Sequence, residues 1–172
     1  MGLGYTDRLA RYSPRLRHVP QYSEHYFLVR KAARAHADQL QIGPKITWAD
    51  AAKGPLCLLS REMYNRTIVD TAFADAGRPV KPVIETNSIL TLALSVMVGG
   101  VCSVLPGALL GAVRGYRELE ALPLVSPEVR TAIGFMIQGG DRTSRALDAA
   151  LTMAKDAAWL RHAAANSGLL VV

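Results

Sequence analysis

The sequence contains few of the residues that mark catalysis, metal binding or a covalent framework. Its two cysteines and four histidines are isolated from one another, so the ligand spacing that zinc sites require is missing. Ser, His and Asp occur, but no GxSxG-type motif does. We therefore expect no metal, no cofactor and no enzyme. Cys57 and Cys102 each lie in an apolar segment, which favours buried free thiols over a disulfide.

Aromatic residues are also scarce, at 6%, whereas 50% of the 172 residues are hydrophobic. This composition suits helices packed on a buried sheet, that is, an α/β protein of one domain or two small lobes. The net charge is +6, which allows nucleic acid or a membrane surface as a partner. The basic residues are spread out, however, and no basic helix has interleaved aromatics. A solvated basic surface is the favoured interpretation.

No secretion signal is recognisable at the start of the sequence, which favours a cytoplasmic protein. The stretch 89–113 contains no charged residue and would be long enough to cross a bilayer. Gly99, Gly100 and Pro106 interrupt it, which predicts a helix, a short strand and a second helix instead. We therefore expect no membrane span.

Hydrophobic periodicity and turn residues predict strands that alternate with helices. Such alternation with short loops favours mostly parallel strands joined by right-handed crossovers. The segment 32–44 is expected to be a connector. Helices are predicted at 47–52 with Thr47 as N-cap, 60–76 with Gly77 as C-cap, 89–98 capped by Asn87 or Ser88, 106–110, and 141–165. Strands are predicted at 2–6, where the strand is expected to be buried, and at 16–19, 22–29, 56–59, 81–85, 101–105, 119–124 and 131–137.

Several of these segments resemble, in order and spacing, the second lobe of LysR-type transcriptional regulators. They are 46–52 (ITWADAA), 55–59 (PLCLL), 70–77 (DTAFADAG), 82–88 (PVIETNS) and 99–106 (GGVCSVLP). The resemblance implies a two-lobed α/β fold similar to type 2 periplasmic binding proteins, with mostly parallel sheets. Lobe one would comprise 1–50 and 138–172 and be incomplete at its start, and lobe two would comprise 51–137.

The resemblance also implies a function: sensing a small-molecule effector bound between the lobes. Strand ends and helix N-termini there suit an anion, and formate or another small carboxylate is the expected effector. Arg61 and Arg66 could pair with a carboxylate, although Arg66 also suits an exposed, solvated helix face. Ser60 or Asn65 could instead cap a helix, and near Thr86 the residues Asn87 or Ser88 could do the same. The candidate effector-binding residues are Thr6, Ser60, Met63, Tyr64, Asn65, Arg66, Thr86, Thr131 and Ile133.

The partners implied by the resemblance are a homodimer or tetramer formed through this domain and the effector itself. DNA would be contacted only through an N-terminal helix-turn-helix, and the sequence contains none. Two alternatives remain. The chain could be a dimerisation module that binds no ligand, or a solute-binding protein of the same fold.

Overall fold

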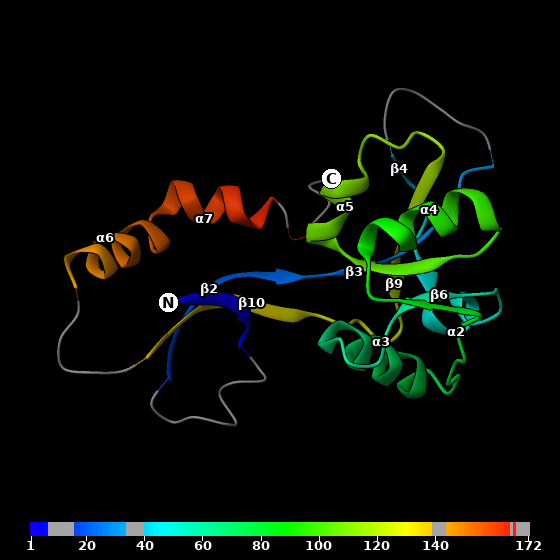
Figure 1. Ribbon diagram of the computed structural model, residues 1–172, viewed down its shortest axis with the longest axis horizontal. Helices are drawn as coiled ribbons and strands as arrows, with labels where there is room; N and C mark the ends of the chain where they lie inside the picture. Colours follow the sequence, from blue (N-terminus) through cyan, green and yellow to red (C-terminus); the bar gives the residue numbers. More distant parts are fainter. Residues whose placement is uncertain (7–15, 34–39, 139–143, 166, 168–172) are drawn as a thin grey trace. The chain divides into compact units, whose positions relative to one another are not determined.

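The chain forms two compact units, which the computed structural model describes over residues 1–6, 16–33, 40–138, 144–165 and 167 (Figure 1). Unit 1 comprises Met1–His25 and Arg130–Val172, and unit 2 comprises Tyr26–Val129. These bounds differ from the expected lobes of 1–50 with 138–172 and 51–137. Residues 26–50 belong to unit 2 because the strand that starts at Tyr26 pairs with strands of that unit. Residues 130–137 belong to unit 1 because the strand that starts at Thr131 pairs with a strand of unit 1.

The sheet of unit 2 is mixed, so the expectation of mostly parallel sheets is wrong. Strand β3 (Tyr26–Lys31) lies between β8 (Ser103–Pro106) and β9 (Leu119–Val125) and runs antiparallel to both. Strands β4 (Gln41–Ile42) and β5 (Ile46–Thr47) run parallel to β9. Strand β6 (Cys57–Leu59) runs parallel to β7 (Ile84–Thr86), and the parallel bridge between Leu56 and Cys102 lies beside it.

Strands that are joined through a helix are nevertheless parallel to each other in unit 2. Strands β8 and β9, which are joined through α5 (Gly107–Val113), both oppose β3 and are therefore parallel to each other. Likewise β6 and β7, joined through α3 (Tyr64–Asp75), are parallel. The antiparallel pairs in this sheet come from β3, which is inserted between two parallel strands.

Both faces of this sheet are buried, which explains why β3 begins with four apolar residues. Phe27 and Val29 pack under α4 (Ile89–Gly99) and α5, in a cluster with Leu92 and Val96. On the other face Leu28 packs with side chains of α2 (Trp48–Ala51) and α3. The largest buried side chains of that second cluster are Trp48, Phe73 and Tyr26.

The helix ends in unit 2 follow from local chemistry. The Thr47 side chain caps α2 by accepting from the Asp50 N–H, and Ser88 caps α4 by accepting from Thr91, as the sequence predicts. Helix α3 starts at Tyr64 rather than at residue 60, and β7 starts at Ile84 rather than at residue 81. Within the described parts of the chain, no helix is long and apolar enough to cross a membrane.

Unit 1 contains an antiparallel sheet in the order β1 (Gly2–Tyr5), β10 (Thr131–Gln138), β2 (Leu16–Glu24). Strand β1 is not buried as expected, because it lies at the sheet edge and Leu3 is 57% exposed. The two strands predicted at 16–19 and 22–29 also divide differently: the break falls at His25, between β2 and β3. Pro20 is accommodated because β2 is an edge strand.

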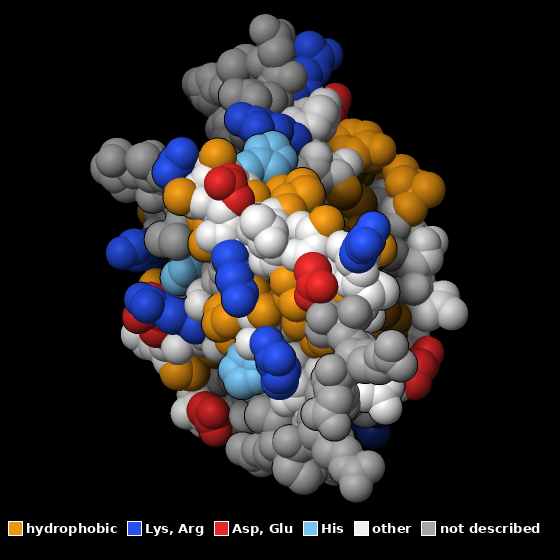
Figure 2. All heavy atoms as spheres, turned by 90° about the vertical axis from the view of Figure 1, so that its left-hand side faces the viewer, with side chains coloured by type: hydrophobic (Ala, Val, Ile, Leu, Met, Phe, Trp, Pro, Cys, Tyr) orange, Lys and Arg blue, Asp and Glu red, His pale blue; other side chains and the backbone are white. Residues whose placement is uncertain are grey.

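Two helices replace the single helix expected at 141–165, of which 141–143 lie outside the described residues. Helix α6 (Arg145–Ala154) has Lys155 as its C-cap, and α7 (Ala157–Ala164) has Asp156 as its N-cap. The Asp156 carboxylate accepts hydrogen bonds from the Ala158 and Trp159 N–H groups and so starts a new helix. The buried Gln21 of β2 holds both helices, donating to the Ala154 carbonyl and accepting from the Trp159 indole. Figure 2 shows the side of the molecule that lies on the left in Figure 1, where hydrophobic side chains lie between Lys, Arg and His side chains.

Candidate functional site

The carboxyl ends of the parallel strands of unit 2 form the candidate site. Strands β6 and β7 are parallel, so their last residues, Leu59 and Thr86, lie side by side at one edge of the sheet. Helices α3 and α4 both begin just beyond these ends. The first N–H groups of a helix lack intrahelical partners and carry partial positive charge. This edge is therefore suited to negatively charged or hydrogen-bond-accepting groups.

A turn over residues 60–63 connects β6 to α3. The Ser60 N–H donates to the Thr86 carbonyl at 2.9 Å, and the Met63 N–H donates to the Ser60 carbonyl at 3.0 Å. The Thr86 hydroxyl oxygen accepts from the Ser88 N–H at 3.1 Å. Three predicted residues, Ser60, Met63 and Thr86, thus meet in one small network. Neither Ser60 nor Asn65 caps α3, because its N-cap is Met63, which makes no side-chain cap hydrogen bond.

Asn65 lies in the first turn of α3, on the helix face that packs on the sheet. Only 7% of it is exposed, and its Nδ2 has no hydrogen-bond partner among the described residues. An unsatisfied buried donor costs about 1–3 kcal/mol. The first turn of α3 therefore carries a side-chain amide that a hydrogen-bond acceptor from outside the described residues would satisfy. Tyr64, the first residue of α3, is partly buried beside it.

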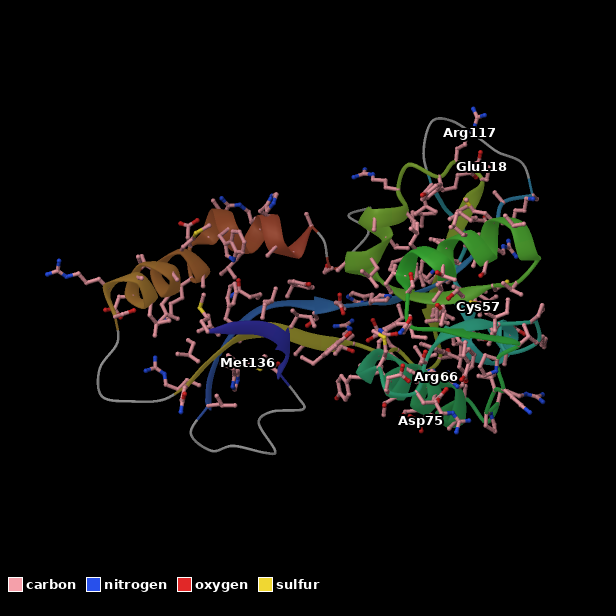
Figure 3. All side chains as sticks on the ribbon, viewed as in Figure 1. Cys57, Arg66, Asp75, Arg117, Glu118 and Met136 are labelled. Atoms are coloured by element: carbon pink, nitrogen blue, oxygen red, sulfur yellow. The ribbon has the colours of Figure 1, made fainter. Side chains whose placement is uncertain are left out.

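Arg66 is buried, contrary to the expectation of a solvated arginine on an exposed helix face. It is 2% exposed and lies among the side chains between α3 and the strands (Figure 3). Its Nη1 donates to the Leu59 carbonyl at 2.7 Å and to the Glu85 carboxylate at 2.9 Å, and its Nε donates to Asp70 at 2.7 Å. Burial acts to lower the pKa of Arg66, but the bonds to Asp70 and Glu85 outweigh it, so that the pKa is raised.

Asp70 and Glu85 are partners of Arg66 that the sequence did not reveal. The spacing of Arg66 and Asp70, four residues apart on one helix, is a known signal for an ion pair. Glu85 lies on strand β7, and no local sequence pattern connects it to Arg66.

The remaining predicted residues, Thr6, Thr131 and Ile133, are all buried in unit 1. Ile133 lies opposite Tyr5 in the pairing of β10 with β1, and Thr131 lies opposite Glu24 of β2. Thr6 directly follows β1, and its hydroxyl donates to the Ala132 carbonyl at 3.2 Å. The structure thus brings the predicted residues together as two groups, one within each unit.

Other features of the described residues offer less chemistry. Unit 1 has a groove of about 450 Å³ lined partly by Arg17, His18 and Lys155, which contains no predicted site residue. No group of three metal-ligating side chains occurs in the described part of the chain. Cys57 and Cys102 are free thiols, and burial raises the pKa of each.

The fold and the sequence match one family. The family model of the LysR substrate binding domain matches residues 1–159, so the chain belongs to this family. LysR-type proteins are transcription regulators, and the expectation of a non-enzymatic chain is confirmed. Among curated proteins, none matches the sequence.

Solved structures of LysR regulators have a similar fold. The effector binding domain of QuiR in complex with shikimate is 16% identical, with a TM-score of 0.64, 93% of this chain covered and 78% of that one. The regulatory domain of CcmR from Synechocystis PCC6803 in complex with 2-PG is 15% identical, with a TM-score of 0.65 and coverage of 81% and 65%.

A full-length regulator, CbnR complexed with its target DNA, is 16% identical, with a TM-score of 0.65 and 88% of this chain covered. The chain spans 49% of the length of CbnR. At these identities the likeness to solved structures concerns the fold.

Proposed function

We propose that this chain is an effector-sensing domain of a LysR-type regulator and binds a small anionic metabolite, such as formate or another small carboxylate. The observation that carries the proposal is the unsatisfied Nδ2 of Asn65 in the first turn of α3, where no side chain caps the helix. The hydroxyl groups of Ser60 and Thr86 lie at the same sheet edge. Donors at this edge favour a ligand rich in acceptors.

We also retain Thr6, Thr131 and Ile133 as candidate ligand contacts within unit 1, and Met63, Tyr64 and Arg66 as residues that support the turn in unit 2. QuiR and CcmR were solved with small metabolites bound, which supports a ligand of this size here. Effector binding would shift the relative populations of two lobe arrangements and so influence DNA binding elsewhere in the whole regulator. We further propose that a helix-turn-helix of the whole regulator makes the DNA contact, and that the regulator acts in the cytoplasm.

Thermal unfolding in the presence of formate, shikimate or inorganic phosphate tests this function. A ligand present at a hundred times its dissociation constant adds about 2.7 kcal/mol to the free energy of unfolding. Asn65→Ala and Thr6→Val should each weaken binding several-fold, because truncating a hydrogen-bond partner typically removes about 1 kcal/mol. Thr67→Ala, at an exposed position on the same helix, is the matched control. Unchanged affinity in both site variants would remove these residues from the site.

A second candidate function, a dimerisation module, is favoured by a separate observation. Helix α4 contains no charged residue, and its Leu90, Leu94 and Val98 are 60%, 43% and 85% exposed. Their spacing of four residues places them on one helix face. Ile84, the first residue of β7, and Val83 before it are exposed as well. Contiguous exposed apolar surface commonly marks an interaction site, and we assign this one to a second copy of the chain.

Light scattering after size-exclusion chromatography decides this point. Leu94→Glu should convert a dimer into a monomer, because it places a carboxylate in an apolar contact. Thr71→Glu, at an exposed position on α3, is the control and should leave the dimer intact. A wild-type dimer that binds none of the three anions would favour dimerisation as the function of this chain. A wild-type monomer would refute the assignment of this surface.

A further inference from the structure

We propose that Arg66 is a positioning residue that fixes the distance between the two strand ends that carry Ser60 and Thr86, and that it does not itself bind the effector. The inference rests on the proposed function and concerns how its site is held in shape. It reassigns a residue that the sequence presents as a possible carboxylate ligand.

The Arg66 guanidinium joins the ends of two strands. Its Nη1 donates both to the carbonyl of Leu59, the residue before Ser60, and to the carboxylate of Glu85, the residue before Thr86. One nitrogen atom therefore bridges β6 and β7 at the point where each strand ends. The Ser60 N–H bond to the Thr86 carbonyl lies directly beyond this bridge. Movement of the guanidinium would therefore alter the spacing of the two hydroxyl-bearing residues.

The guanidinium is itself held in place by a third acceptor. Nε donates to Asp70 at 2.7 Å, one turn further along the same helix, so that three acceptors from three elements fix the group. A planar fork with several donors can meet acceptors in different directions, whereas a lysine ammonium on a flexible stem cannot reproduce this geometry. Burial makes the arrangement specific, because an arginine that is 2% exposed cannot exchange these partners for water.

The charge of Arg66 is fully compensated by its partners. Two carboxylates, Asp70 and Glu85, share one guanidinium, which leaves one net negative charge in the cluster. Arg66 therefore has no uncompensated positive charge to offer an anion. Attraction of an anion at this edge falls instead to neutral donors and the start of α3.

Amide hydrogen exchange on the whole chain without ligand tests the proposal directly. Arg66→Met should speed exchange at the Ser60 and Ser88 amides by on the order of ten- to a hundredfold, the equivalent of losing hydrogen bonds to a charged group. Exchange at Leu122, in the central sheet, reports global stability and should change far less. Arg66→Lys should restore part of the protection. Arg78→Met, at an exposed position beyond the other end of α3, removes the same charge and should change neither amide.

A second pair of variants keeps the test decisive if Arg66→Met does not fold. Glu85→Leu removes the acceptor on β7 and should speed exchange at Ser60 and Ser88. Asp70→Leu removes an acceptor within α3 and should affect these amides less. The side chains of both carboxylates are more than 40% exposed, so both variants should fold. Unchanged exchange at Ser60 and Ser88 in every variant would overturn the proposal. Equal acceleration at Leu122 would overturn it too, because it would show a general structural role.

The binding arm uses the probes formate, shikimate and inorganic phosphate. Where one of them binds the wild-type chain, Arg66→Lys should weaken that binding severalfold while the chain remains folded. If none binds, the proposed effector function fails, whereas the exchange experiment still decides the role of Arg66.

Discussion

Truncation of Phe73 provides the sharpest test of the core of unit 2. The Phe73 side chain is completely buried, and its ring packs edge-on against Trp48 with centroids 5.0 Å apart and an interplanar angle of 88°. Phe→Ala changes in cores cost about 3–5 kcal/mol. Loss of an edge-to-face pair accounts for about 0.5–1.5 kcal/mol of such a cost. We therefore expect Phe73→Ala to lower the free energy of unfolding of unit 2 by about 4 kcal/mol.

Urea unfolding followed by Trp48 fluorescence measures this loss. The chain has two tryptophans, one in each unit, so a Trp159→Phe background leaves Trp48 as the reporter of unit 2. With a denaturant slope of about 2 kcal/mol per molar urea, the expected loss moves the midpoint down by about 2 M. Phe73→Leu, which retains most of the volume, should cost less than about 1.5 kcal/mol. A midpoint shift below about 0.5 M for Phe73→Ala would refute the position of Phe73 in the core.

Three further predictions concern other parts of the chain. Gly134→Ala should cost unit 1 about 1–3 kcal/mol, because its Cβ would lie 2.7 Å from the Val19 carbonyl oxygen; unchanged urea unfolding would contradict this. Ser88→Ala should cost about 1 kcal/mol through loss of the cap of α4, measured by the same titration, with an unaltered midpoint as the opposing result. Burial raises the pKa of the Cys57 and Cys102 thiols. Iodoacetamide at pH 8 should therefore modify the native chain far more slowly than the unfolded chain. Equal rates of modification would show that the thiols are accessible in the native chain. Since the unfolded thiols lose their protons first, stability should also fall as pH rises above about 8.5.

The elements that the sequence predicted well are those set by local chemistry. The caps at Thr47 and Ser88 are side-chain bonds to N–H groups three residues away, and such contacts are visible in a short window of sequence. The parallel arrangement of strands joined by helices also follows from short-range rules. The match over residues 1–159 confirms the family resemblance, and solved LysR domains have a similar mixed α/β fold.

The direction of β3 was not predictable in this way. Leu28 pairs with Val104 on one side and with Leu122 on the other, and no local pattern specifies partners so distant in the sequence. The alternation of strands and helices predicts parallel pairing, whereas β3 is antiparallel to both of its neighbours.

The burial of Arg66 illustrates the same limit for the candidate site. Arginine is usually exposed. The burial of Arg66 depends on Glu85, which lies on β7, 19 residues further along the sequence. The sequence predicted Arg66 on an exposed helix face, whereas the structure buries it and bonds it to Leu59, Asp70 and Glu85. Whether the predicted residues bind an effector stays a prediction.

The order of the units along the chain has a consequence for synthesis and folding. Unit 2 is continuous, whereas unit 1 is completed only by residues after Val129. Because Phe27 of β3 pairs with Pro123 of β9, the folded unit 2 holds its own beginning and end on neighbouring strands. Chains emerge from the ribosome N-terminal end first, so unit 2 can close before β10 exists to pair with β1. We therefore expect unit 2 to shorten the loop that unit 1 must close, so that a variant that slows unit 2 also delays the assembly of unit 1.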